Sequence, residues 1–167
     1  MYFEQVFTHA WQDDPSQPGV SVISVAYEPT AAGRRWLLLA ALPHFSELVP
    51  FDDAAQAREF ARAVLRLPVA AEPYEHELVL SDEETRSTPS GPRRQVCTAQ
   101  LSVGRDPADG LRPYLAYQSY YGFPGDPAMT GLGLQVCCAD ADAARLRAEA
   151  GLLLRALDDE GPGRGTA

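Results

Sequence analysis

Seven stretches of the chain have the length and composition of β-strands, and most of them alternate hydrophobic and polar residues, which is the spacing of a strand with one buried face. These stretches are residues 2–11, 20–27, 35–42, 74–80, 95–103, 113–121 and 132–138. Residues 35–42 are apolar on both faces, so we expect either a central strand covered on both sides or a strand at a dimer contact.

Two other stretches repeat their apolar residues at helical spacing. The first is predicted over residues 53–67, where Asp52 or Asp53 can cap the helix and Phe51 can pack as a hydrophobic staple. The second can be capped by Asp140 or Asp142 and ends before residue 161. Its apolar stripe consists of Ala143, Leu146, Ala150, Leu153 and Leu157.

The elements follow the order βββα-ββββα, and the grouped strands with short connections predict an α+β fold with a mostly antiparallel sheet of about seven strands. Residues 81–94 are polar and contain Pro and Gly, so we expect a mobile loop there. We predict a single globular domain over residues 1–160 and a disordered C-terminal tail over residues 161–167. The two halves share a similar order of elements, although no residue-level repeat is visible.

The composition excludes several classes of function. The chain has 167 residues and a net charge of −9, which argues against a generic duplex-DNA binder. All 14 basic residues are Arg, and neither Lys nor Asn occurs, as expected for a GC-rich bacterial genome. Without Lys there is no Schiff-base lysine and no P-loop lysine, and without Asn there is no Cys-His-Asn protease triad.

The cysteines indicate a reduced, cytoplasmic protein. There are three of them, which is an odd number, and none belongs to a C-x-x-C motif. Cys97 and Cys138 lie on apolar strand faces and are expected to be buried. Cys137 points to the opposite face, where it is a free thiol, packs under a second layer, or forms a vicinal disulfide with Cys138. The N-terminus has no signal-peptide pattern, and no apolar run approaches the roughly 20 residues of a membrane helix, so we expect no membrane association.

The richest candidate surface is the aromatic strand near residue 117. Its side chains alternate between two faces, one of which must be exposed or interfacial. Tyrosines there can anchor a protein interface or stack on single-stranded bases, or they can simply be good strand residues. The interface candidates are Tyr114, Tyr117, Tyr120, Tyr121, Phe123 and Arg112.

No catalytic or metal-binding motif is present in the sequence. His9, His44 and His76 are too far apart to supply a ligand pair from one strand or helix, so we expect neither a metal nor a cofactor. The acidic pairs are typical of solvated surface, and Ser and Thr lack any nucleophile motif.

Our leading hypothesis is therefore a small acidic cytosolic protein that binds another protein without catalysis, as an adaptor, chaperone or immunity-type module, with a homodimer expected. One alternative is a β-sheet that binds single-stranded nucleic acid. That alternative requires local convergence of Arg34, Arg35, Arg93, Arg94 and Arg112. Another is an enzyme whose site is assembled from distant residues, with His76, Cys137 and the acidic clusters as suspects.

Overall fold

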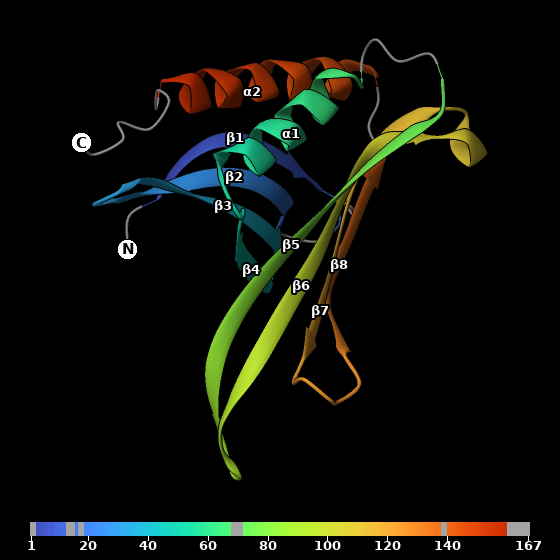
Figure 1. The fold of residues 1–167 in the computed structure, drawn as a ribbon. Coiled ribbons are helices and arrows are strands. Elements are labelled where there is room, and N and C mark those ends of the chain that lie inside the picture. Colours follow the sequence, from blue (N-terminus) through green and yellow to red (C-terminus); the bar gives the residue numbers. More distant parts are fainter. Residues whose placement is uncertain (1–2, 13–15, 17–18, 68–71, 138–139, 160–167) are drawn as a thin grey trace.

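The computed structural model describes residues 3–12, 16, 19–67, 72–137 and 140–159, and these form two successive ββββα units (Figure 1). The first unit consists of β1 (Glu4–Trp11), β2 (Ser21–Thr30), β3 (Gly33–Leu42), β4 (Phe45–Pro50) and α1 (Ala54–Leu65). The second consists of β5 (Tyr74–Thr88), β6 (Gly91–Asp106), a 3₁₀ turn (Pro107–Asp109), β7 (Arg112–Gly122), β8 (Met129–Cys137) and α2 (Asp140–Asp158). The predicted tail and Cys138 lie outside the described residues.

The α+β class and the antiparallel pairing are confirmed. The strands form two four-stranded sheets, in the orders β1-β2-β3-β4 and β5-β6-β7-β8, in place of one sheet of about seven. The strand missing from the sequence prediction is β4, which pairs with β3 directly after a tight turn. Its alternation was hidden because the inward position between Phe45 and Val49 is occupied by a charged residue, Glu47.

The prediction of a mobile loop at residues 81–94 is wrong. Strands β5 and β6 continue through this stretch and meet at a tight turn, where Thr88 Oγ1 donates to the carbonyl of Gly91 at 2.7 Å. Gly91 has a φ of 102°, a conformation that favours glycine. Strand β7 pairs with β6 only from Val96 onward, and Val96 pairs with Glu83, so residues 84–95 form a two-stranded arm that extends past the rest of the sheet (Figure 1).

The two helices lie side by side over the sheets and share one core with them (Figure 1). Phe60 of α1 packs edge-to-face on Phe7 of β1 with 5.1 Å between the ring centroids. The helix at the predicted residues 53–67 is confirmed. Its N-cap is Asp53, whose carboxylate accepts from the backbone N–H of Gln56 at 2.9 Å.

Strand β3 lies between β2 and β4 and is buried on both faces, as its apolar pattern indicated. Leu38 belongs to the core at 0% exposure, whereas Leu37, at 3%, points to the opposite face of the sheet. The homodimer inferred from this pattern stays a prediction. Within the described residues, neither helix has the length and apolar character needed to cross a membrane.

Candidate functional site: a groove along a free strand edge

A buried carboxylate joins the two sheets. Glu47 of β4 is 5% exposed and accepts hydrogen bonds from the Tyr117 hydroxyl at 2.7 Å and the Ser119 hydroxyl at 2.9 Å, both on β7. The backbone N–H of Leu132 in β8 lies 3.3 Å from the same carboxylate. A buried carboxylate needs hydrogen-bond partners, and here all three come from the second sheet. These hydrogen bonds therefore fix the inward face of β4 to β7 and β8.

An irregularity in β8 directs the third donor at Glu47. Pairing between β7 and β8 shifts by one residue between Gln118 and Tyr120, which is a β-bulge. The freed N–H of Leu132 donates to Ser119 Oγ at 2.8 Å as well as toward Glu47. The bulge needs Gly131, since a Cβ at this position would lie 2.4 Å from Ser119 Oγ.

The polar groups around Glu47 keep their protons. Burial, followed by the hydrogen bond to Glu47, raises the pKa of Tyr117 far above its usual value, and burial also raises the pKa of Tyr121. The pKa of the neighbouring Cys97 thiol is raised mainly by burial, against a smaller opposing effect of its hydrogen bond with Tyr121. A thiol with a raised pKa is a poor nucleophile, so this cluster has the chemistry of a structural junction.

A groove of about 310 Å³ opens between β4 and the second sheet, at the base of the arm. Phe45, Ser46, Glu47, Leu48 and Val49 form one side, and Asp82, Glu84, Arg86, Gln95, Cys97 and Tyr121 form the other. Phe45 and Leu48 are 53% and 38% exposed, so β4 presents apolar side chains to solvent. Arg86 forms an ion pair with Glu84 at 2.8 Å, so the groove keeps the negative charges of Asp82 and Glu47.

The groove runs along an open strand edge. At the edge of β1, the N–H of Thr8 donates to Glu149 of α2 at 3.2 Å, and at the edge of β5 the carbonyl of Val79 accepts from Gln56 of α1 at 3.0 Å. Strand β4 is also an edge strand, and within the described part of the chain its backbone over residues 45–49 has no hydrogen-bond partner outside β3. Since only every second residue of an edge strand bonds to its neighbour, the remaining N–H and C=O groups face the groove.

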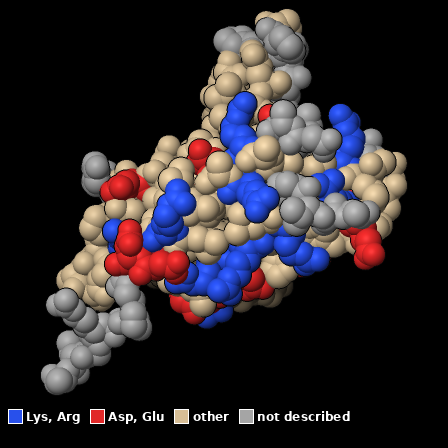
Figure 2. All heavy atoms as spheres, turned by 90° about the horizontal axis from the view of Figure 1, so that it is seen from above, with Lys and Arg blue, Asp and Glu red and all other residues tan. Residues whose placement is uncertain are grey.

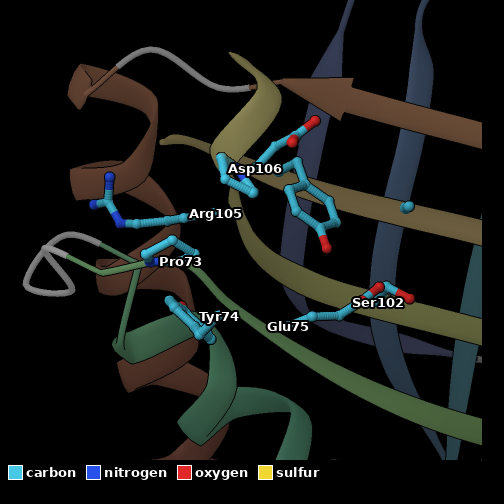
Figure 3. Close-up of a pocket in the computed structure, with 9 residues that line it drawn as sticks. Pro73, Tyr74, Glu75, Ser102, Arg105 and Asp106 are labelled. Carbon is cyan, nitrogen blue, oxygen red and sulfur yellow. The ribbon is translucent and has the colours of Figure 1, made fainter. Parts of the chain in front are cut away.

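A second, larger cavity of about 500 Å³ lies on the other face of the second sheet (Figure 3). Its walls include Tyr74, Glu75, Ser102 and Tyr114. Burial and the nearby Glu75 raise the pKa of Tyr114 to about 12, so its hydroxyl is a donor at neutral pH. Figure 3 shows Arg105 extending away from Glu75 and Ser102, and this guanidinium instead donates to the carbonyl of Leu111 at 3.0 Å. The cavity is open, and the guanidinium of Arg105 is held by this backbone carbonyl, while Glu75 and Asp106 remain among the lining residues.

The aromatic residues proposed as an interface do not lie on one surface. Tyr117 is 1% exposed, so the prediction that it could contact a partner is corrected: its face of β7 packs into the core. Tyr121 lines the groove, Tyr114 lines the second cavity, and Tyr120 is half-buried on the outer face. Phe123 lies under Arg93, whose guanidinium is 4.5 Å from the ring centroid.

The arginines required for nucleic-acid binding do not converge on one face. Arg34 donates to the carbonyl of Ala156 in α2 at 2.8 Å, so its guanidinium lies against this helix and not beside the arm that carries Arg93 and Arg94. Arg94 pairs with Thr85 on the arm, whereas the exposed Arg112 pairs with Asp106 at the opposite end of β6. Twelve residues of strand separate Arg94 from Asp106, which is roughly 40 Å.

The suspects for an assembled enzyme site are also separate. His76 Nε2 lies 2.8 Å from Glu59 of α1, on the helix side of the second sheet. The side chain of Cys137 is outside the described part of the structure. Among the described residues, no three His, Cys, Asp or Glu side chains are grouped so that they could hold a metal ion.

Sequence reasoning missed Glu47, the residue on which the geometry of the groove depends. The signal available was the pattern Phe45–Ser46–Glu47–Leu48–Val49, a strand alternation with one charge at an inward position. Comparisons of the chain with protein-family models, curated proteins and solved structures find no match.

Proposed function

We propose that this protein is a non-catalytic protein-binding module that takes up an extended segment of a partner along the free edge of β4. The observation that carries the proposal is the open hydrogen-bonding edge of β4 inside a groove, where the edges of β1 and β5 are each contacted by a helix side chain. A strand added to an open edge gains backbone hydrogen bonds that do not depend on its sequence.

Specificity in such a complex comes from alternate side chains of the added strand. Phe45 and Leu48 offer partly exposed apolar surface beside the groove. Burying one leucine side chain contributes about 1.5–3 kcal/mol, which corresponds to roughly a tenfold to hundredfold change in affinity. The backbone of a bound segment therefore lies along β4, and its apolar side chains pack against Phe45 and Leu48.

The test begins with selection of binders from a random twelve-residue peptide library displayed on phage. The affinity of the best synthetic peptide is then measured by fluorescence anisotropy for the wild-type protein and for Leu48→Asp. Leu152→Asp is the matched control, because Leu152 is 44% exposed but lies on α2. We expect at least a tenfold loss of affinity for Leu48→Asp and less than a twofold change for Leu152→Asp.

Backbone pairing is tested by methylating the amide nitrogens of the selected peptide one at a time. Because every second residue of an added strand bonds to β4, methylation should abolish binding at alternate positions and leave it intact at those between. Uniform tolerance of methylation contradicts strand addition. A dimer of the wild-type protein that becomes a monomer in Leu48→Asp, measured by light scattering, means that a second copy occupies the edge and overturns the proposal of a different partner.

A further inference from the structure

The outer side of the helical layer is rich in exposed arginine, although the protein as a whole carries a net charge of −9. Figure 2, which views the molecule from above the helices, shows arginines gathered across the middle of this face. We call this surface the arginine face. Its exposed members on α1, its C-cap and α2 are Arg62, Arg66, Arg145, Arg147 and Arg155.

Three carboxylates of the same helices are engaged within the molecule, and a fourth, Asp142, lies near the buried His9. Glu59 faces His76 of β5, Glu149 accepts from the N–H of Thr8, and Asp158 pairs with Arg58. By contrast, no ion pair joins a carboxylate to any of the five arginines of the arginine face within the described residues. The helical layer therefore presents positive charge that the protein itself does not neutralise.

The positive surface is limited in extent. Helix α2 has 19 residues and is therefore about 28 Å long. The contact of Arg58 with Asp158 places the C-terminal end of α2 beside the first turns of α1, where Asp52 and Asp53 are also exposed. Acidic side chains thus gather at one end of the arginine face, and a long polyanion crossing this end would meet repulsion.

We propose that the arginine face binds a short acidic segment of a partner protein. Guanidinium groups present a planar fork that matches a carboxylate in two parallel hydrogen bonds, and all the basic groups here are of this kind. A compact run of Asp and Glu can bind away from this acidic end, whereas a nucleic acid carries its charge along its entire length and is repelled by the rest of the surface. This surface is separate from the β4 groove and does not depend on it.

The probe is a fluorescein-labelled twelve-residue peptide of alternating Glu and Ala, and its binding is followed by anisotropy at 20 mM and 200 mM salt. The double variant Arg62→Glu/Arg155→Glu reverses two charges of the face, one on each helix. Arg93→Glu/Arg94→Glu makes the identical change in net charge on the arm, where these arginines pair with Asp126 and Glu83. Circular dichroism melts confirm that both variants are folded.

We expect wild-type binding that weakens at least tenfold between the two salt concentrations. Affinity should fall at least tenfold in Arg62→Glu/Arg155→Glu and less than threefold in Arg93→Glu/Arg94→Glu. An equal loss in both variants would show an effect of net charge alone and overturn the proposal, as would absence of binding at 20 mM salt. A labelled twelve-nucleotide thymidine strand that binds the same arginines more tightly than the peptide would assign the face to nucleic acid instead.

Discussion

Replacing Tyr117 by Phe removes one hydroxyl from the junction between the two sheets and leaves the ring in place. This hydroxyl donates to Glu47 at 2.7 Å in a site where Tyr117 is 1% and Glu47 is 5% exposed. Water therefore has little access to replace the lost donor. The carboxylate keeps Ser119 and the Leu132 N–H, so the change removes one of three hydrogen bonds.

The expected cost follows from the type of bond that is lost. A hydrogen bond to a charged group contributes about 1.5–3 kcal/mol to folding, and here the acceptor stays buried. We therefore expect Tyr117→Phe to lower the free energy of unfolding by about 2 kcal/mol. For a chain of this size, that corresponds to a decrease in Tm of roughly 4 to 8 °C.

Equilibrium unfolding in urea, followed by tryptophan fluorescence, measures this free energy, because Trp36 is 2% exposed and reports on the core. The control is Tyr120→Phe on the same strand, since Tyr120 is half-buried and its hydroxyl has no hydrogen bond within the described residues. We expect the control to lose less than 0.5 kcal/mol, as is usual for substitutions away from such features. Equal losses in the two variants would refute the assignment of Glu47 and Tyr117 as the connection between the sheets.

Two further predictions concern the buried His9 and the bulge in β8. Burial lowers the pKa of His9, with Asp142 opposing and Arg145 reinforcing the effect, so the unfolded chain binds a proton at higher pH than the folded protein. The free energy of unfolding should therefore fall as pH decreases below about 6.5. His9→Gln should reduce this dependence in urea titrations between pH 5 and 8. Gly131→Ala should lower the free energy of unfolding by about 1–3 kcal/mol, because its Cβ would lie 2.4 Å from Ser119 Oγ. Gly122→Ala, whose nearest neighbour would be 3.5 Å away, should cost less than 1 kcal/mol, and similar losses in both variants would contradict the role given to the bulge.

Sequence patterns predicted the elements that are stabilised by residues close together in the sequence. The Asp53 cap and the apolar spacing of α1 specify a helix wherever it packs, and the structure contains it. The arm was mistaken for a loop because its residues are polar on both faces, and a two-stranded ribbon beyond the sheet buries little on either side. Its pairing depends on the turn at Thr88 and Gly91, which ordinary alternation does not reveal.

The site could not be predicted because it is formed by contacts between the two units. The strand position of Tyr117 was predictable, but its burial depends on β4 of the other sheet, which supplies the acceptor Glu47. Seventy residues separate these two side chains in the sequence. An isolated tyrosine-rich strand is equally compatible with a surface and with a core, and only the partner sheet decides between them.

The same interlocking of the two units explains why the edge of β4 stays open. Each helix reaches the first strand of the other unit: Glu149 of α2 contacts the edge of β1, and Gln56 of α1 contacts the edge of β5. Strand β4 is held differently, through its inward carboxylate, because Glu47 bonds to β7 and β8 across the faces of the sheets. A contact through a side chain that stands perpendicular to the sheet leaves the in-plane N–H and C=O groups of the strand unpaired. The hydrogen bonds of Glu47 that join the two sheets therefore leave the edge of β4 exposed to the groove. Loss of these hydrogen bonds should weaken peptide binding as well as lower the stability of the fold.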